Sequence, residues 1–269
     1  MLFLLAAEIA VAQPFTVVID PGHGGKRVVG VNDGSQASHG ASHNNASVTV
    51  EGKVFYEKDL ALSYSTFLAH HLVARGMTVR MTRKEDRSVS AMMRAAIAVE
   101  NQADVFLAIH FNAGGGEGAR AYVVAEDHVR WEYLHFFNPY LERDAALGRE
   151  LVLGLDEAFR AFGGRGSEKK VFVDTRFPAK SAAAGALGLG NLKDGIRTIG
   201  YARLDPHLYR AAVVLLEVEF MDEPQRARWL ISRDAHEAAA RALGQALAKW
   251  RDGGRDHFRV EAPRKAPGR

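Results

Sequence analysis

Hydrophobic positions along the chain follow two alternating patterns. Continuous apolar runs rich in β-branched residues predict buried strands at 15–20, 77–82, 105–109, 119–125 and 213–220. Apolar residues spaced three or four positions apart predict amphipathic helices at 57–75, 88–101 and 147–162, and a closing helical stretch from Pro224 to about Trp250. Strands of this kind that alternate with helices predict an α/β fold with a single domain, in which helices cover both faces of a mostly parallel twisted sheet.

Two segments of the chain fit neither pattern. Residues 26–56 and 165–195 lack a period and are rich in Gly and in small or polar residues, so we expect long irregular loops there. In the helix at 88–101 we expect the apolar side chains to face inward, namely Val89, Met92, Met93, Ala96 and Ile97.

The composition limits the chemistry that the chain can support. Its 269 residues include no cysteine, which excludes disulfide scaffolds, thiolate nucleophiles and iron–sulfur clusters, so any metal must be held by His and carboxylate ligands. The net charge of +3 belongs to residues 251–269, which contain six Lys or Arg and three Asp or Glu; the other 29 basic and 29 acidic residues balance. A neutral body argues against nucleic-acid binding, which needs a basic face on the fold.

Four ionisable residues lie where an α/β sheet places its sites, near the carboxyl ends of strands. His23 follows the first strand, His110 ends the strand at 105–109, and Glu57 begins the helix after the long loop. Two His and one Glu can hold a catalytic zinc ion with the fourth position open. Glu217, in the last strand, could then accept a proton from the attacking water.

Ordinary structural roles are the alternatives to this site. A histidine at a strand end is more often a turn or capping residue than a ligand, and Glu57 could be a first-turn acid favoured by the helix dipole. No local motif joins His23, Glu57 and His110, which are separated by 34 and 53 residues. Glu217 is harder to explain in this way. A carboxylate within the apolar run VVLLEVEF is expected to be buried, which is costly unless the group is paired or linked to a metal.

Several segments within residues 15–250 occur together in a characteristic order. They are VVIDPGHGG at 17–25, EKDLAL at 57–62, GMTVRMTRKED at 76–86, Arg94, ADVFLAIHFNA at 103–113 and LLEVEFMDEP at 215–224. In this set and order the chain resembles the zinc-dependent N-acetylmuramoyl-L-alanine amidases of bacterial cell walls. The resemblance implies one zinc ion per chain held by His23, Glu57 and His110, with Glu217 as the catalytic carboxylate. It also implies hydrolysis of the amide bond between N-acetylmuramic acid and the L-alanine of the stem peptide.

Departures from the family pattern leave alternatives open. The family usually has a small residue where this chain has Glu219. Residues 217 and 219 point to the same side of a strand, so Glu219 could share or compete for the base role. We expect Glu217 to act as the base, from its place in the motif. His39 and His43 in the long loop could bind metal, although solvated loop histidines are the simpler interpretation. Two other functions also stay open: a non-catalytic peptidoglycan-binding or regulatory domain, and a zinc hydrolase of another amide or peptide.

The two chain ends and the cellular setting complete the prediction. The start MLFLLAAEIAVAQ contains an A-x-A pattern similar to a signal-peptidase site, so we expect residues 1–12 to be a signal-peptide remnant, 13–250 the catalytic domain and 251–269 a flexible basic tail. We expect an exported monomer, periplasmic or otherwise extracytoplasmic, without a transmembrane segment. Its expected partners are peptidoglycan as the substrate and an activator protein, because uncontrolled wall cleavage would be hazardous. No nucleic-acid partner is expected.

Overall fold

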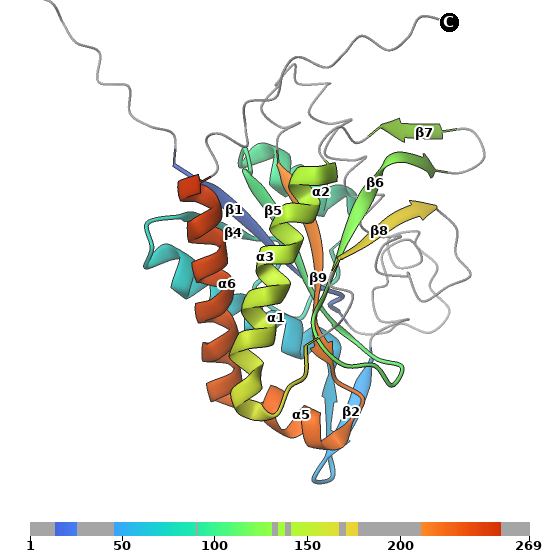
Figure 1. The fold of residues 1–269 in the computed structure, drawn as a ribbon, viewed down its shortest axis with the longest axis vertical. Coiled ribbons are helices and arrows are strands. Elements are labelled where there is room, and N and C mark those ends of the chain that lie inside the picture. Colours follow the sequence, from blue (N-terminus) through green and yellow to red (C-terminus); the bar gives the residue numbers. More distant parts are fainter. Residues whose placement is uncertain are drawn as a thin grey trace, which may run out of the picture.

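A seven-stranded sheet forms the centre of the computed structural model, which describes residues 14–25, 46–89, 91–130, 134–137, 141–166, 171–176 and 211–253 (Figure 1). The strand order is β4-β1-β5-β9-β6-β7, and β8 also pairs with β6. The strands are β1 (Thr16–Pro21), β4 (Thr78–Met81), β5 (Val105–Asn112), β6 (Arg120–Arg130), β7 (Leu134–Phe137), β8 (Val171–Arg176) and β9 (Ala212–Phe220). β4, β1, β5 and β9 run parallel to one another, whereas β6 is antiparallel to β9.

Helices cover both faces of this sheet. α1 (Glu57–Val73), α3 (Leu141–Phe159) and α6 (Arg233–Gly253) pack on one face, where α3 and α6 lie side by side (Figure 1). α2 (Ala91–Glu100) covers the other face, and α5 (Pro224–Leu230) connects β9 to α6. This architecture confirms the predicted single α/β domain with a mostly parallel sheet. Within the described residues, no helix is both long and apolar enough to cross a membrane.

The alternation of side chains along the strands divides the core between the two faces. Val17 and Ile19 of β1 belong to the cluster formed with α1, α3 and α6, whereas Val18 belongs to the cluster formed with α2. All three side chains are fully buried. Because the inner strands are covered on both faces, nearly every position in them is apolar, and most of the polar exceptions lie towards their carboxyl ends. This is the physical reason why continuous apolar runs predict β1, β5 and β9.

The packed side of α2 differs from the prediction. Met93 is 56% exposed, and Ile97 is only partly buried. Ala95, Ala98 and Val99 are buried against the sheet instead. Met93 points outward, although it is larger and more apolar than the alanines. The inner face of α2 is therefore not set by the size or hydrophobicity of its apolar side chains alone.

The predicted loop at 26–56 contains a β-hairpin. β2 (Ser47–Val50) and β3 (Lys53–Tyr56) pair in antiparallel fashion. Glu51 and Gly52 join them with positive φ angles of 52° and 78°, which is the backbone of a two-residue hairpin turn. Each strand has only four residues, too few to show a period among the polar residues around them.

The predicted loop at 165–195 and the closing helical stretch also differ in detail. β8 lies within that loop and pairs in parallel with β6. The closing stretch divides into α5 and α6, because the Ser232 hydroxyl accepts a hydrogen bond from the Ala235 amide (3.2 Å) and so caps a second helix. α6 continues three residues into the predicted tail at 251–269. Residues 1–12 and the rest of that tail lie outside the described residues.

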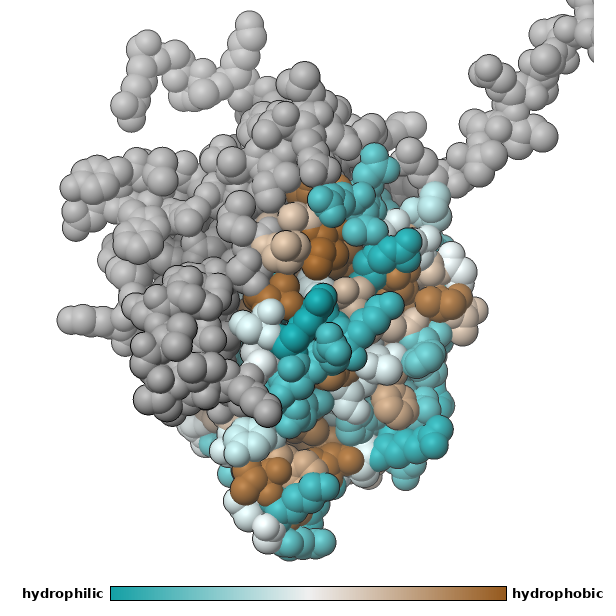
Figure 2. Space-filling view, turned by 180° about the vertical axis from the view of Figure 1, so that it is seen from behind, coloured by the Kyte–Doolittle hydropathy of each residue, from teal (hydrophilic) through white to brown (hydrophobic). Residues whose placement is uncertain are grey.

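Polar and charged residues cover most of the described face that is seen from behind in Figure 2. The apolar residues on this face form separate patches with hydrophilic residues between them. The large apolar side chains that are exposed come from four elements and are Val54, Tyr56, Val73, Met93 and Leu153. Scattered apolar residues of this kind are normal on protein surfaces. The exposed apolar side chains therefore do not indicate a functional site, whereas the polar groups at the carboxyl ends of the strands do.

Candidate metal centre and active site

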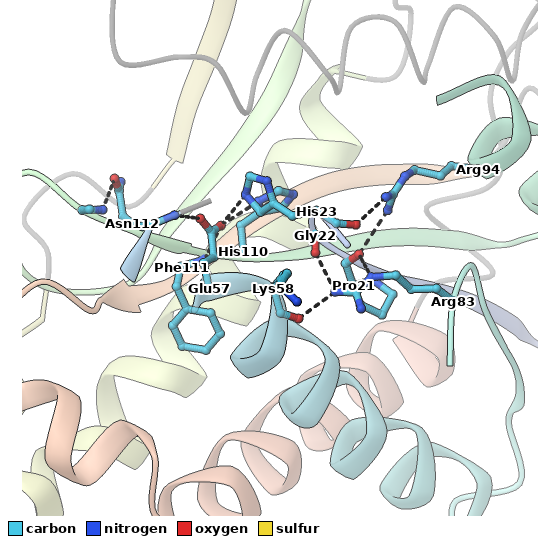
Figure 3. A network of polar contacts seen from close by, with 12 residues as sticks. Pro21, Gly22, His23, Glu57, Lys58, Arg83, Arg94, His110, Phe111 and Asn112 are labelled. Carbon is cyan, nitrogen blue, oxygen red and sulfur yellow. Dashed lines mark hydrogen bonds and ion pairs between the residues drawn. The ribbon is translucent and has the colours of Figure 1, made fainter. Parts of the chain in front are cut away.

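Three of the predicted site residues come together at the carboxyl ends of β1 and β5. His23 lies in the turn after β1, His110 lies in β5, and Glu57 begins α1. The Glu57 Oε1 atom is 3.0 Å from His23 Nε2 and 2.9 Å from His110 Nδ1 (Figure 3). One ligand atom of each side chain lies within 4.8 Å of the others, so this group could hold a metal ion.

Close packing at the end of β1 brings the two histidines together. The Gly22 amide donates a hydrogen bond to the Ile109 carbonyl (2.8 Å), which joins the turn to β5. A Cβ atom at Gly22 would lie 2.5 Å from His110 Cε1, so only glycine fits beside that ring. His23 has a φ of 55°, in the left-handed region. Its ring meets the His110 ring edge to face, with centroids 4.9 Å apart.

Two buried arginines hold the backbone that carries the ligands. Arg83 donates hydrogen bonds to the Gly22 and Lys58 carbonyls, both at 2.7 Å, and so ties the turn after β1 to the first turn of α1 (Figure 3). Arg94 donates to the His23 carbonyl (2.8 Å). Both side chains are almost fully buried. Neither role can be read from the sequence, because nothing local distinguishes a buried arginine from a surface one.

Glu57 is held in its ionised form. The side chain is buried, its Oε1 accepts a hydrogen bond from the Phe111 amide (3.1 Å), and its Oε2 accepts one from the Ala46 amide (3.3 Å). Burial alone would raise the pKa of Glu57, but the charges and hydrogen bonds of His23 and His110 outweigh it and lower this pKa to about 2. A carboxylate oxygen between two imidazoles is a ligand set typical of catalytic zinc.

Glu217 lies beside this cluster in the sheet, because β9 pairs Glu217 with His110 of β5. Its Oε2 atom is buried and has no hydrogen-bond partner among the described residues. Burial raises the pKa of Glu217 to about 8; Glu57 adds to the rise, whereas His110 and Arg120 oppose it. An unpaired buried carboxyl oxygen is costly in a purely structural role.

Glu219 has different surroundings from Glu217. The register between β5 and β9 shifts by one residue just after Glu217, so the simple alternation that would place both carboxylates on one side does not hold through this bulge. The Glu219 Oε1 atom accepts hydrogen bonds from the Gly118 amide (2.7 Å) and the Phe220 amide (2.8 Å). Arg226 lies 3.9 Å away. The Glu219 carboxylate therefore has hydrogen-bond donors, whereas the Oε2 atom of Glu217 has none among the described residues.

The glycine-rich loop at 113–118, directly after β5, is anchored by the segment that follows β9. Asp222 accepts hydrogen bonds from two loop amides, both at 2.7 Å, and Arg226 donates to the Gly116 carbonyl (2.7 Å). Together with Glu219, these side chains position the loop beside the candidate site. The sequence offers no signal for this role, because the loop and its anchors are about a hundred residues apart.

Two further polar residues of the described part, Asn112 and His71, are not among the three clustered ligands. Asn112, the last residue of β5, accepts a hydrogen bond from the Ala113 amide (2.8 Å). His71, inside α1, lies 3.0 Å from Glu237 of α6. The loop histidines at positions 39 and 43 lie outside the described residues.

The sequence profile of the family described as N-acetylmuramoyl-L-alanine amidase matches residues 17–249, which is most of the chain. The chain belongs to the N-acetylmuramoyl-L-alanine amidase family. Among curated proteins, this amidase-family chain is 34% identical to the N-acetylmuramoyl-L-alanine amidase CwlM of Bacillus licheniformis over 109 residues, 40% of this chain and 35% of that protein. It is 31% identical to a sporulation-specific N-acetylmuramoyl-L-alanine amidase of Bacillus subtilis over 107 residues, 40% of this chain and 35% of that protein. The chain thus spans about a third of the length of these two relatives.

Solved structures of amidases share the fold of this amidase-family chain. The catalytic domain of CwlV from Bacillus (Paenibacillus) polymyxa superposes with a TM-score of 0.51 at 18% identity, covering 88% of this chain and 98% of that one. The CwlD amidase from Clostridioides difficile, solved in complex with the GerS lipoprotein, gives a TM-score of 0.54 at 17% identity, covering 89% and 99%. At these identities the likeness supports the fold alone.

Proposed function

We propose that this amidase-family chain is a zinc hydrolase that cleaves the amide bond between N-acetylmuramic acid and the L-alanine of the peptidoglycan stem peptide. The observation that carries this proposal is the cluster of His23, Glu57 and His110 beside the unpaired carboxyl oxygen of Glu217. Family membership over residues 17–249 supports the substrate class. The names of the curated relatives support the bond that is cleaved.

The cluster fits zinc by donor type and by spacing. Two imidazole nitrogens and one carboxylate oxygen are a common catalytic set, in which the fourth coordination position is left open. The two nitrogens lie 3.0 Å and 2.9 Å from the Glu57 oxygen, close to the separation of neighbouring ligands around an ion with bonds of about 2 Å. One zinc ion per chain would polarise the scissile carbonyl and make water a nucleophile near neutral pH.

The side chains of the protein supply the proton transfers and the positioning. Glu217 accepts a proton at a carboxyl oxygen from the attacking water and then delivers it to the leaving nitrogen. Its buried position favours the protonated form that must persist between these two steps. Arg83 and Arg94 bind the backbone beside the ligands, which keeps His23 and Glu57 in place while the substrate binds.

We further propose that residues 13–250 form the catalytic domain of an exported protein, acting in the periplasm or elsewhere outside the cytoplasm. The substrate lies there, and residues 1–12 contain the A-x-A pattern expected of a cleaved leader. Residues 251–269 would act as a basic tail that adds attraction to an anionic wall or membrane surface. An activator protein is proposed as a second partner, since one structurally similar amidase has been solved with a lipoprotein.

A peptidoglycan digest tests the reaction. Purified chain loaded with zinc is incubated with isolated peptidoglycan, and the soluble products are analysed by mass spectrometry. We expect free stem peptides that begin with L-alanine, and elemental analysis giving about one zinc per chain. The matched control is Glu217→Gln, which keeps all three ligands and is expected to retain zinc while losing most of the activity.

Other digestion products would overturn the proposal in defined ways. Cleaved glycan strands or cleaved peptide cross-links would show that the site acts on a different bond. Binding to peptidoglycan without any hydrolysis by the zinc-loaded chain would show a non-catalytic binding domain. If the chain takes up no zinc after reconstitution, His23, Glu57 and His110 do not form a zinc site.

A further inference from the structure

Arg120 continues the row of active-site residues across the sheet. β5 and β9 pair His110 with Glu217, and β6 pairs Arg120 with Glu217 from the other side. Residues directly opposite each other on neighbouring strands project from the same face of a sheet. The three side chains therefore form one row, with Glu217 between the candidate metal ligand His110 and the guanidinium of Arg120.

Two aromatic rings hold the Arg120 guanidinium. Its Cζ atom lies 4.4 Å from the centroid of the Phe220 ring and 5.5 Å from that of Phe172. Stacking on aromatic rings orients the planar group and leaves the N–H donors at its edge for a ligand in the same plane. The rings therefore fix where an acceptor could bind.

Arg120 hydrogen-bonds with the side chain of Tyr122, but this contact does not satisfy all of its donors. Its Nε atom is buried and has no hydrogen-bond partner among the described residues. Although Arg120 and Glu217 are opposite each other in the strand register, no ion pair within 4.0 Å joins them in the described part of the chain. A buried guanidinium N–H and a buried carboxyl oxygen that both lack a partner among the described residues are costly unless each binds something else. This arrangement suits a substrate that brings its own acceptor.

The direction of the row indicates which part of the substrate reaches Arg120. Glu217 must contact the leaving nitrogen to protonate it, so the peptide begins next to Glu217, and Arg120 is its neighbour on the side away from His110. Neighbouring strands lie about 4.8 Å apart, and one residue of an extended peptide spans about 3.5 Å. A group on the second residue of the peptide therefore lies within reach of Arg120.

We infer that Arg120 binds the α-carboxylate on the second residue of the stem peptide, and so selects peptides in which this group is ionised. The inference rests on the proposed amidase function. A guanidinium group binds a carboxylate through two parallel hydrogen bonds. A carboxamide at the same place presents only one acceptor oxygen and no charge, so it binds more weakly.

Two synthetic muramoyl dipeptides test this inference. N-acetylmuramoyl-L-alanyl-D-glutamate carries the free α-carboxylate, and N-acetylmuramoyl-L-alanyl-D-isoglutamine carries a carboxamide there. We expect the zinc-loaded wild type to hydrolyse the acid with a kcat/KM at least about tenfold above that of the amide, chiefly through a lower KM. In Arg120→Gln this ratio falls towards one. Arg120→Lys, which keeps the charge but loses the planar pair of donors, gives an intermediate ratio.

The ratio of the two substrates keeps the test valid for a variant that folds poorly, because the amount of active enzyme cancels. Arg80→Gln is the matched control. Arg80 is an exposed arginine of β4, at the far end of the strand order from β6. This control is expected to keep the wild-type ratio.

The outcomes separate this inference from the proposed function. A wild type that hydrolyses both dipeptides equally, or an Arg120→Gln variant that keeps the wild-type ratio, overturns the role of Arg120 and leaves the amidase activity standing. A zinc-loaded wild type that hydrolyses neither these dipeptides nor isolated peptidoglycan overturns the proposed function itself.

Discussion

Replacing Glu217 by glutamine is expected to raise stability at alkaline pH while it abolishes catalysis. Burial raises the pKa of Glu217 from an ordinary value of 4.5 to about 8 in the metal-free chain. Between these two pH values the folded chain holds a proton that the unfolded chain releases. The stabilising contribution of this proton is complete below pH 4.5 and is lost as the pH rises through about 8.

The expected change in the free energy of unfolding follows from the width of the pH range between 4.5 and about 8. Each pH unit within it lowers the free energy of unfolding by about 1.4 kcal/mol, which amounts to about 5 kcal/mol between pH 4.5 and 8. A glutamine at this position does not titrate. We therefore expect Glu217→Gln to gain stability relative to the wild type by about 5 kcal/mol across this window, starting from near equality or a small deficit at the acid end.

Urea unfolding measures this difference directly. Wild type and Glu217→Gln are unfolded in the presence of a chelator at pH 5, 6, 7 and 8, with helical circular dichroism as the signal. Glu157→Gln, which changes an exposed carboxylate of α3, is the control and is expected to follow the wild type at every pH. Parallel pH profiles of wild type and Glu217→Gln would refute the assignment of a buried, costly carboxylate.

Zinc provides a second arm of the same experiment. A divalent cation held by His23, Glu57 and His110 would favour the ionised form of Glu217, because an opposite charge nearby stabilises a carboxylate. We therefore expect the advantage of Glu217→Gln at pH 8 to shrink in zinc-loaded protein. If Glu217→Gln stays as much more stable than the wild type at pH 8 with zinc as without it, the cation binds elsewhere.

Two further substitutions test the packing around the site. Glu219→Gln removes a charged acceptor from the Gly118 amide, so we expect a loss of about 1–3 kcal/mol in the free energy of unfolding by urea. The kcat of this variant is expected to stay within about threefold of wild type, and a loss as large as that of Glu217→Gln would make Glu219 the base. Gly22→Ala places a Cβ atom 2.5 Å from His110 Cε1, so competition with a chelating dye is expected to show zinc affinity at least about tenfold weaker. Gly154→Ala, whose new Cβ would lie 3.5 Å from its nearest neighbour, is expected to bind zinc like wild type; equal affinities of both variants would show that the His110 ring has room to move.

The central strands and the larger helices could be predicted from the sequence because their patterns are local. β1, β5 and β9 are apolar at nearly every position since both of their faces are covered. α1 follows the expected spacing of its apolar residues and ends shortly before Gly76, whose φ is 74°. In each case the residues that form the element also carry the signal.

The smaller elements could not be predicted, because they are too short to show a period or because a partner distant in sequence decides them. The strands of the hairpin at 47–56 are too short to carry a period, and β8 depends on its pairing with β6. α2 turns Ala95, Ala98 and Val99 and not Met93 towards the sheet, and the apolar spacing alone does not distinguish these two faces. Burial in these cases is a property of the assembled layers.

The sequence by itself determined the ligand types, since a chain without cysteine can offer a metal only His and carboxylate groups, and it placed candidates at strand ends and at the start of a helix. Only the tertiary structure decided which candidates meet. The 2.9 Å contact of Glu57 with His110 and the row that Glu217 forms with Arg120 depend on strand order and register, which join segments about 50 to 100 residues apart. The separate surroundings of Glu217 and Glu219 depend on a one-residue bulge. Local patterns report burial along one element, whereas a site is a property of neighbouring elements.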